Sequence, residues 1–191
     1  MGATDAAARH HDSTQGEEIA VRHGTASDDA LLAELGARTF RDTFATDNTP
    51  EDMATYLAEA FTPEKQAAEL ADPCSSFLIA EIGGVAVGYA RLKDGVPPAC
   101  ITGPRPIELA RIYAEKSWLG HGVGAALLRA CLDEATRRGH GAVWLGVWER
   151  NVRARAFYQK WGFVEVGTQV FQLGRDLQND VVMQRVGTTS T

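Results

Sequence analysis

The sequence predicts a single α/β domain built on a mixed sheet of about seven strands, most of them antiparallel. Two observations lead to this prediction. Apolar residues recur at helical spacing through the first third of the chain, and strand-like runs follow from residue 77 onward. Helices alternate with strands only in the second half, so parallel pairing should be confined to part of the sheet. The length of 191 residues suits one hydrophobic core.

Three helices are expected between residues 28 and 72, after a short strand over 19–22. Asp28 is a suitable N-cap for the first helix, where apolar side chains recur at three- and four-residue steps. Pro50 and Pro63 each follow a threonine, and proline is favoured at the first position of a helix. These two prolines therefore mark the starts of the second and third helices.

The second part of the chain contains most of the strands. Gly83 and Gly84 separate two strand-like runs and predict a hairpin. Four prolines between residues 94 and 106 predict a loop. The remaining elements are a strand over 107–114, a helix over 122–138, a strand over 142–147, a helix over 151–161, and strands over 163–171 and 181–186.

The two ends of the chain differ from its middle. Residues 1–17 are small and polar without periodicity, which is typical of a disordered extension. Residues 188–191 predict a flexible C-terminus, so we place the domain at residues 18–187. No signal peptide and no apolar run of about 20 residues is visible, and we expect a cytoplasmic protein.

The charge of the chain limits its partners. The formal net charge is −6, and no lysine- or arginine-rich run offsets it. Such a chain repels nucleic acid and anionic membranes, so we expect neither as a partner. A small cationic molecule such as an amine would be attracted. Cys74, Cys100 and Cys131 are too widely spaced for a disulfide framework or a zinc site, and we expect no metal.

A glycine-rich turn joins the strand that ends near residue 114 to a long helix. The first N–H groups of a helix lack a partner within the helix and carry partial positive charge. Gly120, Gly122 and Gly124 would let a pyrophosphate approach these groups. A tight turn without a ligand is one alternative. A dinucleotide fingerprint ending at Ala125 is another, but residues 115–119 separate its glycines from the strand.

A second group of residues lies on the helix predicted over 151–161. Asn151 is a natural N-cap, and Tyr158 follows seven residues later. Both side chains project from one face of the helix, about 10 Å apart along its axis. They are suited to contact a polar ligand, although Asn151 as a simple cap and Tyr158 as a packing residue remain the alternative.

These two segments together resemble the GNAT superfamily of N-acetyltransferases. The turn Leu119 to Gly124 is similar to the acetyl-CoA signature Q/R-x-x-G-x-G/A, except that Leu119 replaces the usual Gln or Arg. The run NVRARAFYQKWGF is similar to the second motif, N-x-x-A-x-x-F/L-Y-x-x-x-G-F. The resemblance spans about residues 19–186 and implies a GNAT-like fold with helices on both faces of the sheet. The segments ELARIYAEKSWLGHGVG, WLGVWERN and FQLGRDLQNDVVMQR look closest to the PaiA-like branch, which includes polyamine acetyltransferases.

The resemblance implies that acetyl-CoA is the co-substrate and that a primary amine, such as that of spermidine, attacks it directly. Tyr158 would protonate the departing thiolate, a phenol of pKa about 10 beside a thiol of about 8.5. The residues implied to bind the coenzyme are Ile112, Tyr113, Ala114, Leu119, Gly120, His121, Gly122, Val123, Gly124, Ala125, Asn151 and Tyr158. Members of the family are often homodimers.

Glu108 is the candidate for the base that deprotonates the amine, because a carboxylate within a mostly apolar strand indicates a specific role. Strand alternation predicts that it shares a face with Ala110 and Ile112, opposite Arg111. A salt bridge to Arg111 or Arg105 is the alternative.

The acceptor remains open at this stage. The helices over 28–72 would form a wall of the amine site, with Phe40, Thr43, Phe44 and Tyr56 as contacts or as core. Acetylation of a protein N-terminus or lysine is one alternative. A module that binds acyl-CoA without catalysis is another, and it would need neither Tyr158 nor a base.

Overall fold

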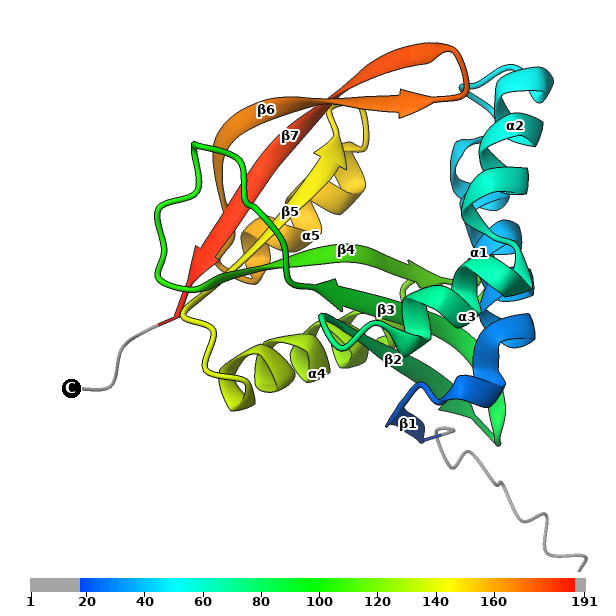
Figure 1. The fold of residues 1–191 in the computed structure, drawn as a ribbon, viewed down its shortest axis with the longest axis horizontal. Coiled ribbons are helices and arrows are strands. Elements are labelled where there is room, and N and C mark those ends of the chain that lie inside the picture. The colour runs from blue at the N-terminus through cyan, green and yellow to red at the C-terminus, as the bar shows by residue number, and fades with distance from the viewer. Residues whose placement is uncertain (1–17, 188–191) are drawn as a thin grey trace, which may run out of the picture.

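The computed structural model describes residues 18–187, so the predictions for residues 1–17 and 188–191 lie outside the described residues. Seven strands form one sheet in the order β1-β2-β3-β4-β5-β7-β6 (Figure 1). Only β4 and β5 run parallel, which confirms the mixed, mostly antiparallel sheet. The strands are β1 (Ile19–His23), β2 (Ser75–Ile82), β3 (Val85–Lys93), β4 (Pro106–Ala114), β5 (Ala142–Trp148), β6 (Val164–Leu173) and β7 (Asp176–Val186).

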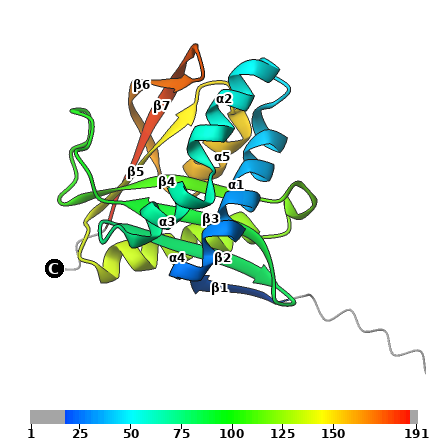
Figure 2. The same ribbon diagram turned by 45° about the vertical axis from the view of Figure 1, so that its right-hand side comes forward.

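Helices cover both faces of the sheet, as Figure 2 shows. On one face lie α1 (Asp29–Phe44), α2 (Pro50–Ala60) and α3 (Pro63–Ala71), around an aromatic-rich core that includes Phe40, Phe61 and Tyr89. On the other face lie α4 (Val123–Arg137) and α5 (Val152–Lys160), around an aliphatic core. No helix between residues 18 and 187 is both long and apolar enough to cross a membrane.

The helix starts mostly follow the sequence. Thr49 and Thr62 each accept a hydrogen bond from the backbone N–H three residues later, ahead of prolines at the first helical position. Asp28 does stand at the N-cap of α1, but its side chain does not cap that helix. It accepts hydrogen bonds from Arg22 and from the Thr25 N–H instead, and these link β1 to the start of α1.

The last strand is longer than predicted. β7 begins at Asp176 rather than near residue 181, because β6 and β7 pair continuously from Leu173 and Asp176 at the turn. The stretch DLQND is poor in strand-forming residues, and antiparallel pairing with β6 overrides that low propensity. The longer strand places Gln178 and Asp180 beside β5 and β6.

The pairing between β4 and β5 is short. Three pairs join them, from Pro106 with Ala142 to Glu108 with Trp144, and none follows along residues 109–114. Beyond this point β4 stays paired to β3, and β5 stays paired to β7. The two central strands therefore separate, and an opening forms between them.

A β-bulge in β4 changes which side chains share a face. Arg91 pairs with Arg111 and Leu92 pairs with Leu109, so Ala110 is the extra residue. Glu108 therefore lies on the same face as Arg111, while Leu109 packs in the core beneath α4. The prediction that Glu108 lies opposite Arg111 was wrong, because simple alternation does not cross a bulge.

A buried ionic cluster holds α3 to the sheet. Glu69 of α3 contacts Arg91 at 2.7 Å and Arg111 at 2.5 Å, and all three side chains are at most 12% exposed. Arg111 also donates a second hydrogen bond, of 3.1 Å, to Glu69. The Glu69 carboxylate is thus the shared counter-charge of two buried guanidinium groups, those of Arg91 and Arg111.

Glu69→Gln should lower the free energy of unfolding by about 3–5 kcal/mol, because it leaves two buried guanidinium groups without a counter-charge. Urea titration measures the change. Glu34→Gln is the matched control, since Glu34 pairs with Arg38 on the surface of α1 and should change stability by less than about 0.5 kcal/mol. Equal effects of the two substitutions would contradict the stabilising role of the cluster.

Candidate active site

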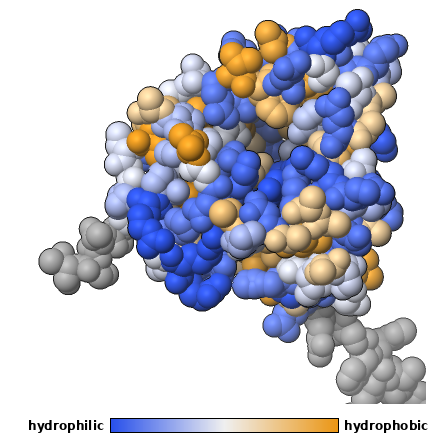
Figure 3. Space-filling view, in the orientation of Figure 1, coloured by the Kyte–Doolittle hydropathy of each residue, from blue (hydrophilic) through white to orange (hydrophobic). Residues whose placement is uncertain are grey.

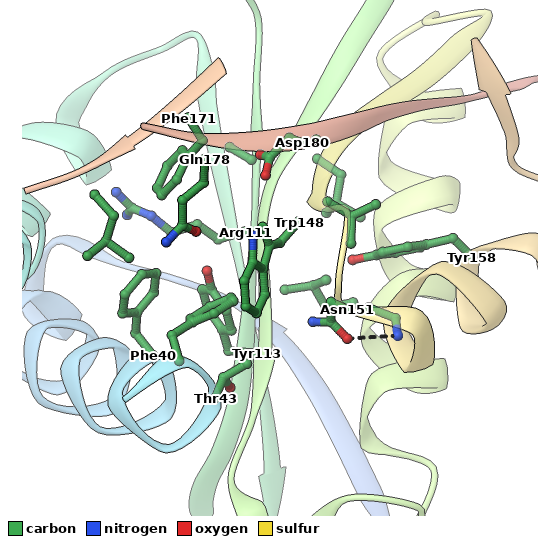
Figure 4. A pocket seen from close by; sticks show the side chains of 18 of the residues that line it. Phe40, Thr43, Arg111, Tyr113, Trp148, Asn151, Tyr158, Phe171, Gln178 and Asp180 are labelled. Carbon is green, nitrogen blue, oxygen red and sulfur yellow. Dashed lines mark hydrogen bonds between the residues drawn. The ribbon is translucent and has the colours of Figure 1, made fainter. Parts of the chain in front are cut away.

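The opening between β4 and β5 contains a pocket of about 260 Å³. It is visible as the hollow near the middle of Figure 3. Side chains and backbone from both faces of the sheet line it, and Figure 4 shows them from close by. The lining residues include Phe40, Thr43, Phe44, Tyr56, Glu108, Arg111, Ile112, Tyr113, Ala114, Leu119, Trp148, Asn151, Tyr158, Phe171, Gln178 and Asp180.

The glycine turn forms the start of α4. Gly120 and Gly122 have φ values of +87° and +91°, which side-chain-bearing residues rarely adopt. Gly122 is the N-cap of α4 and provides no side-chain cap to the N–H groups of its first turn. A Cβ atom at Gly120 would meet nothing within 4 Å, so the turn is open rather than packed against a neighbour. The buried Val123 anchors it to the core.

Three further residues of this turn have different surroundings. Leu119 is 42% exposed and lines the pocket, while its backbone N–H donates to the Lys116 carbonyl. His121 is exposed, and its ring lies edge-on to Trp118 with centroids 5.8 Å apart. Ala125 lies within the first turn of α4. An anion seated on this turn would therefore meet backbone N–H groups more than side chains.

The edge of β4 supplies the next part of the pocket. Ile112, Tyr113 and Ala114 all line it, in the stretch where β4 no longer pairs with β5. Their backbone groups on the β3 side are used in the sheet, whereas those on the β5 side face the opening. An extended ligand arm laid along this edge would find free donors and acceptors.

Asn151 and Tyr158 meet at the same opening from α5 (Figure 4). The Asn151 Oδ1 accepts a hydrogen bond of 3.0 Å from the Ala154 N–H, so this residue caps the helix. The Tyr158 ring packs between Phe157 and Phe163, and in Figure 4 its hydroxyl points toward the opening. The capping and packing roles considered from the sequence are thus both present, together with access to the pocket.

Burial changes the acidity of Tyr158. The side chain is 7% exposed, and desolvation raises the pKa of its phenol well above the ordinary value. Burial therefore sets the pKa of this phenol above the ordinary value near 10 that the sequence suggested. The phenol keeps its proton across the physiological range.

The other half of the pocket is aromatic. Phe40 stacks on Tyr56 at 4.6 Å, Tyr56 meets Phe171 at 5.6 Å, and Phe44 meets Trp148 at 6.2 Å between ring centroids. Phe40 and its neighbours belong to the core beneath α1 and also line the pocket. Two of the helices predicted over residues 28–72, α1 and α2, thus line the pocket, whereas α3 contributes no lining residue.

Glu108 also lines the pocket. Burial raises the pKa of its carboxyl, while the charges of Lys93, Arg91 and Arg111 act in the opposite direction. Neither salt bridge considered from the sequence forms within residues 18–187. Arg111 pairs with Glu69, and Arg105 donates to the Arg138 carbonyl.

Asp180 is a pocket residue that the sequence did not reveal. It lies on β7 opposite Trp148 of β5, and it is 8% exposed. Burial raises the pKa of its carboxyl to about 6. The signal was present in principle: Gln178, Asp180 and Val182 alternate as one face of a strand, but the QND run reads as a turn.

Two hydrogen bonds join the start of α2 and the loop before it to the β6–β7 hairpin. Gln178, which lines the pocket, donates to the Asn48 Oδ1 at 2.6 Å, and the Arg175 N–H donates to the Asp52 Oδ1 at 2.8 Å. The hairpin and α2 lie side by side in Figure 1. These contacts fix the hairpin strand that carries Gln178 and Asp180.

The cysteines stand apart from this chemistry. Cys131 is completely buried in the core, and burial raises the pKa of its thiol, whereas Cys74 is exposed. Cys100 lies in the proline-rich loop and packs against Gly167 of β6. Between residues 18 and 187, no three His, Cys, Asp or Glu side chains are arranged to hold a metal ion.

Comparisons with known proteins agree with this geometry. The family model described as "Acetyltransferase (GNAT) family" matches residues 38–163. An uncharacterised N-acetyltransferase of Lactobacillus delbrueckii subsp. lactis is 34% identical over 151 residues, 79% of this chain and 87% of that protein. The N-alpha-acetyltransferase RimI of Mycobacterium tuberculosis is 39% identical over 99 residues, 52% of this chain and 58% of that protein.

A solved structure shares the fold. The PaiA N-acetyltransferase of Thermoplasma acidophilum, crystallised in complex with coenzyme A, matches with a TM-score of 0.69 at 21% identity and covers 88% of this chain and 99% of its own. The matched family model extends across both the glycine turn and the α5 motif. The chain belongs to the GNAT family and is an N-acetyltransferase that uses acetyl-CoA.

Proposed function

We propose that this enzyme acetylates a primary amine of a small cationic molecule, and that linear polyamines such as spermidine are its acceptor class. The main support for the proposal is that the two faces of the sheet contribute different groups to the pocket. The glycine turn and α5 lie on one face, and an aromatic half with two carboxylates, Glu108 and Asp180, lies on the other. A net charge of −6 adds a general attraction for cations.

On the coenzyme side, the first turn of α4 would hold the pyrophosphate through backbone N–H groups and the helix dipole. The arm of the coenzyme would follow the free edge of β4 at Ile112, Tyr113 and Ala114. A backbone N–H of this edge would stabilise the oxyanion that forms at the thioester carbonyl. Leu119, His121 and Asn151 would add contacts at the margins of this path.

The transfer itself needs three proton movements. The acceptor ammonium first loses a proton to a carboxylate, and its nitrogen then attacks the thioester carbon to form the C–N bond. The C–S bond breaks, and the departing thiolate takes the Tyr158 proton. The second proton of the nitrogen restores Tyr158 through water. Glu108 is the carboxylate proposed from the sequence, and Asp180 is the one that the structure adds.

Acetylation of a protein N-terminus is a second candidate, and the similarity to RimI favours it. The pocket volume of about 260 Å³ and its two carboxylates, Glu108 and Asp180, argue for the small cationic amine. The homodimer and the cytoplasmic location stay predictions.

An acceptor panel tests the proposal directly. Free thiol release from acetyl-CoA should be fast with spermidine or spermine, and slow with a peptide that carries an N-terminal alanine, because two carboxylates line a small pocket that attracts a polycation more strongly. The peptide reacting faster than both polyamines would favour the second candidate. Coenzyme binding without thiol release for any amine would indicate a module without catalysis.

Tyr158→Phe should lower turnover by about 10²-fold or more, because the thiolate then leaves without its proton donor. The dissociation constant for CoA, measured by calorimetry, should stay within about twofold. Tyr89→Phe is the matched control: its hydroxyl is buried without a hydrogen-bond partner in the described chain, away from the pocket. Turnover of the Tyr158 variant equal to that of the control would remove Tyr158 from the mechanism.

Gly122→Ala should weaken CoA binding about tenfold or more, because a Cβ at φ +91° forces the turn to move and costs a charged hydrogen bond. It should also lower the free energy of unfolding by about 1–2 kcal/mol. Gly139→Ala is the control, since Gly139 has a similar φ of +77° but follows the opposite end of α4, so it should lower stability without changing CoA affinity. Equal CoA affinities of the Gly122 variant and the wild type, measured by calorimetry, would contradict the anion site.

A further inference from the structure

We propose that Asp180 is the carboxylate that receives the acceptor ammonium at the opening between β4 and β5 and takes its proton before attack. The inference rests on the proposed function and names the residue that selects a cationic acceptor. Asp180 comes from β7, the neighbour of β5 on the side away from the opening, and in Figure 4 its carboxylate points into the pocket.

The register of the sheet places Asp180 at the level of the reaction. Asp180 is the partner of Trp148, whereas Glu108 is the partner of Trp144, four residues earlier on β5. At about 3.3 Å per residue, the two carboxylates differ in depth by roughly 13 Å along the strand. Glu108 lies where β4 and β5 still pair, and Asp180 lies level with the end of β4 that would hold the thioester.

The two carboxylates also differ in their charge environment. Lys93, Arg91 and Arg111 partly compensate Glu108. Asp180 is 8% exposed, and its carboxylate makes no hydrogen bond or ion pair with another residue between 18 and 187. A carboxylate that is nine-tenths buried without a partner costs free energy, and an incoming ammonium group would supply both the missing charge and the missing hydrogen bonds.

The surroundings of Asp180 suit an alkylammonium. Gly146 leaves space for its carboxylate, since a Cβ there would lie 3.0 Å from the Asp180 Oδ2 and 2.4 Å from the Gln169 Nε2. Trp148 and Phe44 form a wall beside it, and their rings can pack against methylene groups and attract a cation. Tyr158 approaches the opening from the opposite face of the sheet.

The proton balance is complete with the groups present. One N–H bond of the ammonium breaks, Asp180 gains that proton as a neutral carboxyl, and the nitrogen keeps the electron pair that attacks the thioester carbon. Asp180 then loses the proton to water through the open pocket. The overall reaction releases one proton, together with the acetylated amine and the free thiol of CoA.

The same carboxylate predicts a pH dependence. Other titratable or charged groups that line this pocket are Tyr56 on α2, Glu108, Arg111 and Tyr113 on β4, and Tyr158 on α5. Burial raises the pKa of all three tyrosines, so none of them loses its proton near neutral pH. Asp180 must be ionised to accept a proton, so turnover should fall as pH drops below about 6.

The test compares Asp180→Asn with the wild type, using spermidine and acetyl-CoA. The variant keeps the shape of the side chain but neither binds the ammonium as an ion pair nor takes a proton. We expect its kcat/KM for spermidine to fall by about 10²-fold or more, with CoA affinity by calorimetry and the melting temperature preserved. Asp133→Asn, the same change on the exposed face of α4, should match the wild type.

Two further measurements keep the inference testable if the Asn variant is unstable. Asp180→Glu retains a carboxylate and should be more active than Asp180→Asn. The wild-type pH profile needs no variant, and turnover that stays flat from about pH 5 to pH 8 would overturn the inference. Glu108→Gln should keep the acidic limb of that profile.

Failure of the Asp180 inference can be distinguished from failure of the proposed function. An Asp180→Asn variant with kcat/KM within about twofold of the wild type would overturn the inference, as would loss of the acidic limb in Glu108→Gln alone. Both results leave the acetyltransferase proposal intact, with Glu108 as the base. Absence of thiol release by the wild type with every polyamine would overturn the proposed acceptor class itself.

Discussion

The site depends on the early end of hydrogen bonding between β4 and β5. Three pairs hold these strands together up to Glu108 and Trp144, and the strands then diverge. Each strand keeps its other neighbour, so the sheet stays continuous while one row of backbone donors and acceptors is left free. Such a row is normally a liability at a sheet edge, and here a thioester arm can use it. The same gap lets side chains from opposite faces of the sheet approach one reaction centre.

The two faces contribute different chemistry to this gap. The α4–α5 face provides backbone N–H groups at a helix start and a phenol that keeps its proton. The α1–α3 face provides aromatic walls and carboxylates. The charge balance on that face is specific: Glu69 is committed to Arg91 and Arg111, which leaves the pocket carboxylates to act on a ligand. The buried cluster therefore shapes the pocket electrostatically as well as fixing α3.

Local patterns in the sequence predicted the conformation of the glycine turn and the start of α5. The glycines at 120 and 122 are required by positive φ angles, and Asn151 with Tyr158 is fixed by helical spacing. Such features depend on neighbours in the chain, so the sequence displays them. The seven-stranded mixed sheet followed from the order of periodic segments for the same reason.

The acceptor side was less visible because it arises from contacts distant in sequence. Asp180 reaches the pocket only because β7 pairs with both β5 and β6, and its flanking residues resemble a turn. The face of Glu108 depends on the bulge at Ala110, which has no signature in the residues themselves. The hydrogen bonds Arg175–Asp52 and Gln178–Asn48 join residues that are 123 and 130 positions apart.

The bulge at Ala110 also limits how this chain can change in length. Deleting one residue there would restore strict alternation and exchange the two faces of β4 before it. Ile107 and Leu109 would turn toward the pocket, and the Glu108 charge would enter the aliphatic core beneath α4. The extra residue at the bulge therefore determines which side chains of β4 face the pocket. Insertions or deletions within β4 would change those faces, whereas the loop over residues 94–105 can change in length without doing so.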